Sequence, residues 1–243
     1  MYENIEKIYR ERLLSQKPLL KDNDIQLNYI LKYLSKNRSK FILDAGCGNG
    51  NYSFYLSNLG YKNLFAVDLF SSINTEKFKY QQASIDNLPF NSDYFDFIYS
   101  NSVIYYLENP NNGIKEFKRV LNKNGVLIFT AHTKYSLFTL WRVFKRDILK
   151  LKSMEHLRGV KFYSANYYKK RLEENGFEII LQDGYEISFF FYPFYKKMVR
   201  GFFEKIFNKK ISVLNPYINN SIIGKLKSEM AYHLVFIARK IND

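Results

Sequence analysis

Phe41-Ile-Leu-Asp-Ala-Gly-Cys-Gly-Asn-Gly50 joins a short apolar run to a cluster of three glycines. The apolar run predicts a strand, and the helical spacing of apolar residues from Tyr52 to Leu59 predicts a helix after the turn. Glycine has no Cβ, so it accepts a positive φ and lets a ligand approach the backbone closely. The stretch therefore predicts a strand, a tight turn and a helix, with the turn forming the floor of a binding site.

Strands and helices continue to alternate along the rest of the chain. Further strands are predicted at 64–68, 80–84, 95–99, 126–130, 177–181 and 233–238. Helices are predicted at 112–122, where Asn124-Gly125 would form the C-terminal cap, and at 164–175, closed by Gly176. This order predicts an α/β fold with a seven-stranded, mostly parallel sheet and helices on both faces.

The chain carries no Gly/Ser-rich or Pro-rich linker, so residues 1–243 are predicted to form a single domain. Helices are expected within 1–39, around a break at Pro18, and the core within 40–131. Two further segments, 132–162 and 185–230, are predicted to be helical cap insertions over an acceptor site. A charged start without an apolar signal segment favours a cytoplasmic protein, and the single cysteine, Cys47, excludes an internal disulfide and predicts no metal site.

The formal net charge of +14 indicates an anionic partner, for which nucleic acid, a phospholipid surface and an acidic substrate are the candidates. Most of the excess lies in two stretches. Lys134–Lys161 holds 8 basic and 2 acidic residues, and Glu186–Met230 holds 8 basic and 3 acidic residues. Because both stretches are also rich in aromatic residues, the charge alone does not choose among these partners.

Two features of the glycine turn indicate which nucleotide it binds. The dinucleotide pattern G-x-G-x-x-G needs a glycine at position 51, where this chain has Asn51, which disfavours a nicotinamide cofactor. Asp68 ends the next predicted strand 20 residues after Gly48. A carboxylate there can accept hydrogen bonds from both hydroxyls of an adenosine ribose.

These motifs, with Ala83-Ser-Ile-Asp-Asn-Leu-Pro-Phe90 and Tyr94-Phe-Asp-Phe-Ile-Tyr-Ser100, resemble the Rossmann-like class I S-adenosylmethionine-dependent methyltransferases of the ubiquinone/menaquinone and small-molecule type (type 11 family). The resemblance is strong over 40–131 and weaker over 155–183. It implies a methyltransferase that binds S-adenosyl-L-methionine. By this resemblance, Asp68 would contact the ribose of the cofactor, Leu69 and Ile85 its adenine, and the Ser100 backbone another part of it. The methionine part would contact Asp44, Ala45, Gly46 and Gly48.

The chain departs from the family at Ser84, where many relatives carry an aspartate that accepts from the adenine amino group. Ser84 is kept among the predicted cofactor residues, and whether Asp86 replaces that aspartate is left open.

Catalysis needs few side chains, because the sulfonium already activates the methyl group and the protein mainly aligns the reactants. An oxygen acceptor with a high pKa would need a base, for which His132, two residues past the predicted fifth strand, and His156 are the candidates. The alternative is that both only hydrogen-bond loop backbone. His233 falls inside the last predicted strand and is interpreted as structural.

The two basic, aromatic insertions favour a small-molecule or lipid-like acceptor. Apolar and basic residues alternate at helical spacing over Phe194–Phe207 and recur over Phe138–Lys150, which suggests peripheral contact with an anionic membrane. The alternative is that the aromatic residues of these insertions pack on the sheet and that their lysines form a solvated face. A nucleic-acid methyltransferase is disfavoured because Ser100-Asn-Ser-Val-Ile104 lacks the Asn/Asp-Pro-Pro-aromatic sequence of many base methyltransferases. A non-catalytic interaction subunit is the remaining alternative; the oligomeric state is not predicted.

Overall fold

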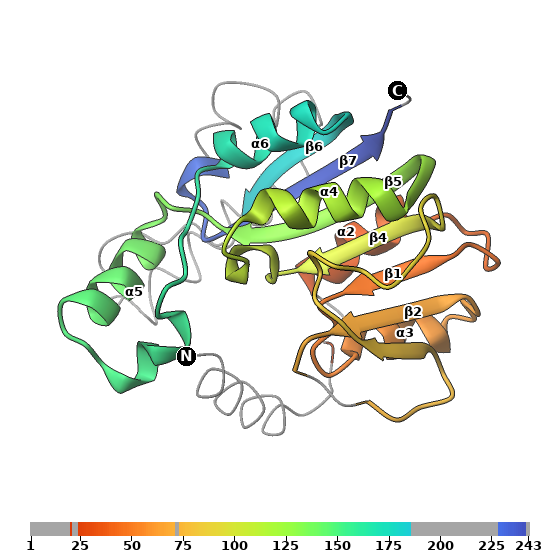
Figure 1. The fold of residues 1–243 in the computed structure, drawn as a ribbon, viewed down its shortest axis with the longest axis horizontal. Helices are drawn as coiled ribbons and strands as arrows, with labels where there is room; N and C mark the ends of the chain where they lie inside the picture. The colour runs from red at the N-terminus through yellow and green to blue at the C-terminus, as the bar shows by residue number, and fades with distance from the viewer. Residues whose placement is uncertain (1–19, 21–23, 71–72, 186–227, 242–243) are drawn as a thin grey trace.

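The computed structural model describes residues 20, 24–70, 73–185 and 228–241 (Figure 1). Its seven-stranded sheet has the order β3-β2-β1-β4-β5-β7-β6. Neighbouring strands from β3 to β5 are parallel, whereas β7 is antiparallel to both β5 and β6. The predicted Rossmann-like, mostly parallel α/β fold is confirmed. The strands are β1 (Ile42–Ala45), β2 (Leu64–Asp68), β3 (Lys79–Gln82), β4 (Phe95–Asn101), β5 (Leu121–His132), β6 (Phe177–Tyr185) and β7 (His233–Lys240).

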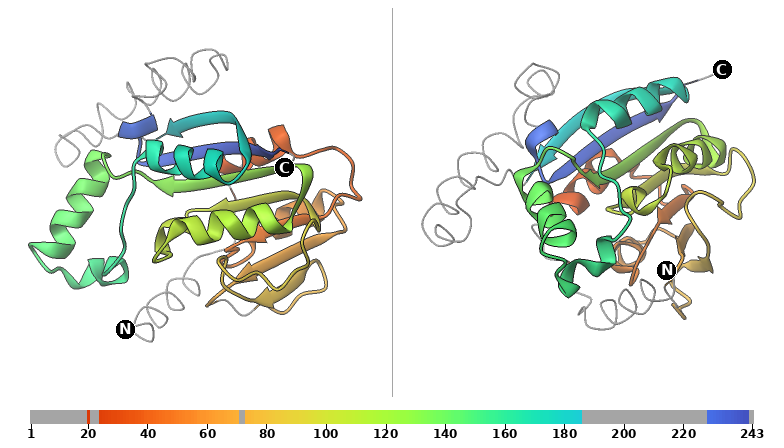
Figure 2. Two further views of the ribbon diagram at one scale, coloured as in Figure 1. Left: turned by 45° about the horizontal axis from the view of Figure 1, so that its top comes forward. Right: turned by 60° about the vertical axis from the view of Figure 1, so that its left-hand side comes forward.

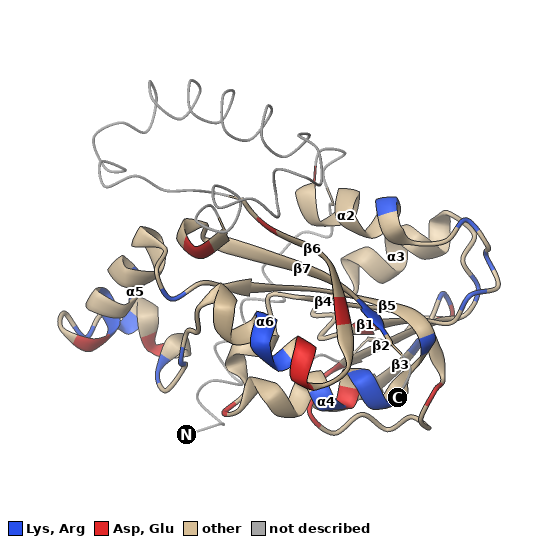
Figure 3. Cartoon of the chain, turned by 90° about the horizontal axis from the view of Figure 1, so that it is seen from above, with Lys and Arg blue, Asp and Glu red and all other residues tan. Residues whose placement is uncertain are grey.

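Helices cover both faces of this sheet, with α4 and α6 on one side and α2 and α3 on the other (Figures 1 and 3). The strand residues alternate between the two cores in the period of two that a pleated sheet imposes. Leu43, for example, lies in the core under α4 and α6, while Ile42 lies in the core under α2 and α3. The helices are α2 (Ile25–Tyr33), α3 (Asn51–Asn58), α4 (Pro110–Val120), α5 (Leu137–Asp147) and α6 (Ala165–Glu174), with short 3₁₀ turns η1 (Ile104–Tyr106) and η2 (Lys152–Leu157).

The helix predicted at 112–122 is shifted in the structure. It begins at Pro110, whose fixed φ suits the first helical position, and Asn109 caps it by accepting from the Asn111 amide at 3.1 Å. The helix ends at Val120, so the predicted cap at Asn124-Gly125 is wrong. Asn124 adopts φ 62° within β5, where the register against β4 shifts. The Asn-Gly pair thus serves a bulge of the strand, which has the same preference for positive φ as a helix cap.

The insertion after β5 forms α5 and η2, which lie beyond the carboxyl ends of the parallel strands (Figure 2). The helices predicted around Pro18, the amphipathic helix predicted at 194–207 and most of the second cap insertion lie outside the described residues. Within the described ranges, no helix has the length and apolar character needed to cross a membrane.

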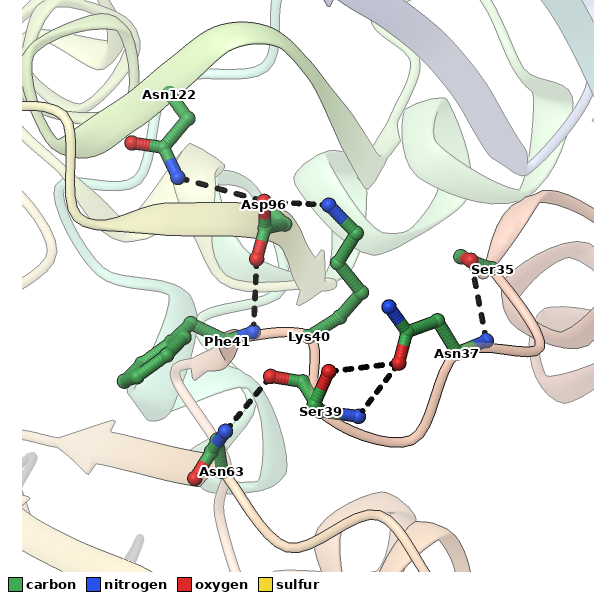
Figure 4. A network of polar contacts seen from close by, with 8 residues as sticks. All are labelled: Ser35, Asn37, Ser39, Lys40, Phe41, Asn63, Asp96 and Asn122. Atoms are coloured by element: carbon green, nitrogen blue, oxygen red, sulfur yellow. Dashed lines mark hydrogen bonds and ion pairs between the residues drawn. The ribbon is translucent and has the colours of Figure 1, made fainter.

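A polar network joins the starts of β1, β4 and β5 at the opposite end of the sheet (Figure 4). The Asp96 carboxylate accepts from Lys40 Nζ and the Phe41 amide, both at 2.9 Å, and from Asn122 Nδ2 at 3.4 Å. Burial raises the pKa of Asp96, but the hydrogen bonds from Lys40 and Phe41 outweigh it, so the pKa lies below its ordinary value. The amino ends of these strands are therefore fixed by groups within the chain.

Candidate functional site

The turn between β1 and α3 forms a tight glycine cradle, defined here as residues 46–50. Gly46, Gly48 and Gly50 have φ of 83°, 55° and 75°, values that residues with a Cβ rarely adopt. The Gly46 and Cys47 amides both donate to the Val67 carbonyl, at 2.8 and 2.9 Å, which ties the cradle to β2. A Cβ on Gly46 would lie 2.4 Å from Cγ2 of Val103, so the space beside this backbone admits no side chain.

Asp68 lies at the end of β2, directly beside the cradle, and is only 4% exposed. One carboxylate oxygen accepts from the Gly48 amide and the other from the Phe70 amide, each at 2.9 Å. Each oxygen of a carboxylate can accept a further hydrogen bond. The cradle therefore orients a buried carboxylate beside the glycine turn, and its contact with a ribose stays a prediction.

Several polar atoms around the cradle are buried and have no hydrogen-bond partner. They are Asn49 Nδ2, Asn51 Oδ1, Ser100 Oγ and both amide atoms of Asn101. A buried polar atom without a partner costs about 1–3 kcal/mol, so such a group of them indicates a polar ligand. S-adenosylmethionine carries an amino group, a carboxylate and hydroxyls that can pair with these atoms. The residues present thus fit the cofactor.

The sequence prediction included Ser100 but missed Asn49, Asn51 and Asn101. The only signal for them was their place, within the predicted turn or just after a predicted strand, where ligands bind in open α/β sheets.

The predicted adenine side contains a carboxylate. The Ser84 hydroxyl donates to Asp86, and the Asn87 amide donates to the Ser84 carbonyl at 3.1 Å. Leu69 is 40% exposed and offers an apolar surface beside Asp68, whereas the Ile85 side chain is buried in the core under α4. Ile85 therefore presents mainly its backbone to a ligand, and the adenine contacts of all three predicted residues stay predictions.

Asp44 lies in the floor of the cradle and is fully enclosed at 2% exposure. Burial raises its pKa to about 7, against the opposing hydrogen bonds from Ser53 and Tyr99. The Ser53 hydroxyl donates to Asp44 at 2.7 Å and lies 3.2 Å from the Tyr99 hydroxyl. The predicted methionine-binding carboxylate consequently exchanges its proton near neutral pH in the cofactor-free protein.

An Asp44→Asn variant is expected to change how the stability of the cofactor-free protein depends on pH. Between about pH 4 and about pH 7 the folded parent holds a proton that the unfolded chain releases. The parent's free energy of unfolding therefore loses up to about 1.4 kcal/mol per pH unit as the pH rises through this window, relative to the variant. Urea unfolding at several pH values measures the difference between the two proteins.

His233 acts in the opposite direction in the same experiment. Burial lowers its pKa to about 4, so its contribution to stability is lost as the pH falls below about 6.5. Because both proteins contain His233, its effect cancels in the difference. Parallel profiles for the parent and Asp44→Asn would show that Asp44 does not hold its proton in the folded state.

The two predicted catalytic histidines meet near the carboxyl end of β5, at a residue that was not among the predicted ones. Arg142 of α5 lies 3.2 Å from His132 Nδ1 and 3.3 Å from His156 Nε2, and it also contacts the Tyr232 hydroxyl. The His132 ring is 5% exposed and stacks between Tyr105 and Tyr232, with centroids 4.5 and 4.1 Å away. Arg142 was not predicted because it is one of eight basic residues in the stretch Lys134–Lys161, and nothing in the sequence distinguishes it from the others.

A role for His132 as general base stays a prediction. Arginine has only donors, so His132 accepts through Nδ1 and carries its proton on Nε2 in this arrangement. If His132 nevertheless acts as the base, His132→Ala is expected to lower kcat by about 10²–10⁴-fold and to remove the rise of the rate with pH. An unchanged pH–rate profile would leave His132 with a stacking role only.

Comparisons with known proteins match the central part of the chain. A family model described as a methyltransferase domain matches residues 21–182. The tRNA U34 carboxymethyltransferase of Campylobacter jejuni is 29% identical over 113 residues, 42% of this chain and 39% of the relative. The malonyl-[acyl-carrier protein] O-methyltransferase of Enterobacter lignolyticus is 32% identical over 122 residues, 46% of this chain and 48% of the relative. The chain thus spans less than half the length of these curated relatives.

The fold is also shared with solved structures. A SAM-dependent methyltransferase from Thermotoga maritima superposes with a TM-score of 0.57 at 17% identity, covering 98% of this chain and 94% of that one. The family model covers more than half of the chain. The chain therefore belongs to the methyltransferase-domain family and shares the fold of a solved SAM-dependent methyltransferase.

Proposed function

We propose that the enzyme transfers a methyl group to a small-molecule or lipid-like acceptor bound between the carboxyl ends of β4 and β5 and the α5 insertion. The observation that carries this proposal is the apolar surface of that insertion. Of the twelve large apolar residues that are exposed in the described part of the chain, six lie within 140–151. A concentration of exposed apolar residues in one insertion is typical of a site that contacts a lipid or an apolar ligand. The six are Leu140, Trp141, Phe144, Ile148, Leu149 and Leu151.

Basic side chains border the same surface and support peripheral contact with an anionic membrane. Lys145 Nζ lies 5.1 Å from the centre of the Trp141 ring, and the Trp141 and Phe144 rings stack at 5.5 Å. A lysine beside an exposed aromatic pair suits the boundary between acyl chains and anionic headgroups. The proposed contact would bring a membrane-borne acceptor to the carboxyl edge of the sheet.

The residues of the chain would act mainly by positioning. The cofactor supplies an activated methyl group on its sulfonium. In the proposal, the cradle and Asp44 hold the methionine part, Asp68 holds the ribose, and the aromatic wall of Tyr105 and His132 excludes water from the acceptor side. Such alignment lowers the barrier by fixing the reactants before the reaction begins.

Methylation of RNA is the second candidate, since several curated relatives are named as tRNA carboxymethyltransferases and the net charge is +14. Phosphate binding, however, favours a basic surface. Six of the eight exposed residues within 140–151 are large and apolar, which favours the lipid-like acceptor.

Transfer of a radioactive methyl group from S-adenosylmethionine distinguishes the two candidates. We expect label in a bacterial lipid extract and none in total tRNA, and we expect the parent to float with anionic liposomes at low salt. A Trp141→Glu/Phe144→Glu variant should lose both the labelling of lipid and the flotation with liposomes, because it places charge on the apolar surface. Leu59→Glu, at an exposed leucine at the C-terminal end of α3, is the matched control. Label found only in tRNA would overturn the proposal.

A further inference from the structure

Arg142 is a buried cation for which the described part of the chain supplies no anion. Its side chain is 9% exposed, although it comes from a helix whose other face is open to solvent. The acidic residues nearest in sequence to Arg142 or to its partner Tyr232 are engaged elsewhere. Asp147 pairs with Arg146, Glu155 pairs with Arg158, and Glu229 accepts from the first amides of α6. A buried charge without a counter-charge is strongly disfavoured, so its retention needs a reason.

The groups that hold Arg142 are neutral and leave part of it available. The guanidinium has five N–H donors, and three of them point to His132 Nδ1, His156 Nε2 and the Tyr232 hydroxyl. Two donors thus have no partner among the described residues. Because the partners are neutral acceptors, they fix the orientation of the guanidinium but do not cancel its charge.

The cluster lies next to the cofactor cradle. Tyr105 of η1 stacks on His132, and Val103, two residues earlier, packs against Gly46. The turn η1 therefore connects the cradle to the Arg142 cluster directly. A ligand group bound at Arg142 would belong to the acceptor, since Arg142 contacts His132 at the end of β5 and Tyr105, just after β4, stacks on that ring.

We propose that Arg142 binds a carboxylate of the acceptor. This inference rests on the proposed function and adds to it a chemical class, an apolar molecule with one carboxylate end. Two adjacent N–H donors match the two oxygens of a carboxylate in the bidentate geometry that arginine favours. A single guanidinium balances one negative charge, whereas a phosphate monoester carries nearly two at neutral pH.

Calorimetry with simple probes tests the inference on the full chain saturated with S-adenosylhomocysteine. We expect octanoate to bind at least about tenfold more tightly than octanol or octyl phosphate, because only octanoate matches both the charge and the two donors. Arg142→Gln should remove the preference for octanoate over octanol. Arg142→Lys keeps the charge but loses the pair of adjacent N–H donors, so it should retain only part of the preference for octanoate. Lys145→Gln, on the same helix, is the matched control and should behave as the parent.

Stability without ligand separates binding from a structural role. If Arg142 is kept for a ligand, Arg142→Gln removes an unbalanced buried charge and should unfold at the same or a higher urea concentration than the parent. A lower midpoint, or octanoate and octanol binding equally to the parent, would overturn the inference. So would a preference for octyl phosphate. Equal binding of acetate and octanoate would instead contradict the lipid-like acceptor of the proposed function, while charge selectivity could still be measured.

Discussion

Asp68→Ala is expected to weaken S-adenosylmethionine binding by about a hundredfold or more. Two hydrogen bonds from ribose hydroxyls to a charged carboxylate contribute roughly 1.5–3 kcal/mol each, and about 1.4 kcal/mol corresponds to a factor of ten. The same substitution releases the Gly48 and Phe70 amides, which Asp68 holds at 2.9 Å, so the cradle itself should loosen. Titration calorimetry with S-adenosylmethionine and S-adenosylhomocysteine measures the loss.

Two variants control this experiment. Asp68→Asn keeps the size of the side chain but places a donor against one of the two amides, so it should bind nearly as weakly as Asp68→Ala. Glu178→Ala, at an exposed carboxylate on β6 with one distant ion pair at 3.7 Å, should bind the cofactor as the parent does. Parent-like binding by Asp68→Ala would remove Asp68 from the cofactor site.

Gly46→Ala is expected to destabilise the protein by about 3 kcal/mol and to abolish measurable cofactor binding. The strain of a left-handed residue with a Cβ costs about 1–2 kcal/mol, and the overlap with Val103 adds a further amount of about 1–3 kcal/mol. Binding fails because the cradle can relieve the overlap only by moving its backbone into the space that the ligand needs. Urea unfolding and calorimetry measure the two effects.

Gly60 provides a matched control, since it has φ 88° but no atom within 4 Å of an added Cβ. Gly60→Ala should therefore cost only the strain, about 1–2 kcal/mol, and leave cofactor binding intact. Adding Val103→Ala to Gly46→Ala should recover the part of the loss that is due to overlap. If Gly46→Ala and Gly60→Ala cost the same, the close approach of Val103 has no energetic weight.

Much of the fold was predictable because its signals are local. The alternation of apolar runs and helical spacing located all seven strands, and β2 matches its predicted range, 64–68. The error at α4 arose because a helix cap and a strand bulge both favour Asn-Gly at positive φ, so the dipeptide alone does not distinguish them. The choice depends on the pairing of β4 with β5, which is not local in sequence.

The cofactor side of the site was more predictable than the acceptor side. Glycines and a carboxylate at strand ends have fixed spacing, because the backbone of one turn creates the cradle. Arg142, Tyr105 and Tyr232 come from three separate parts of the chain, and only packing brings them around His132. Basic residues are frequent in this sequence, so nothing in the order of residues marks Arg142 as the buried one.

The position of β7 between β5 and β6 has a consequence for the order in which the chain folds during synthesis. β7 is the last described strand to leave the ribosome, yet it forms pairs with both of its neighbours. Until residues 233–240 emerge, β5 and β6 each present an unpaired edge, and unpaired edges invite association with other chains. The parallel strands β1 to β5 can assemble early, but closure of the sheet has to wait for the final strand. A nascent chain halted before β7 is thus the form of this protein most exposed to aggregation.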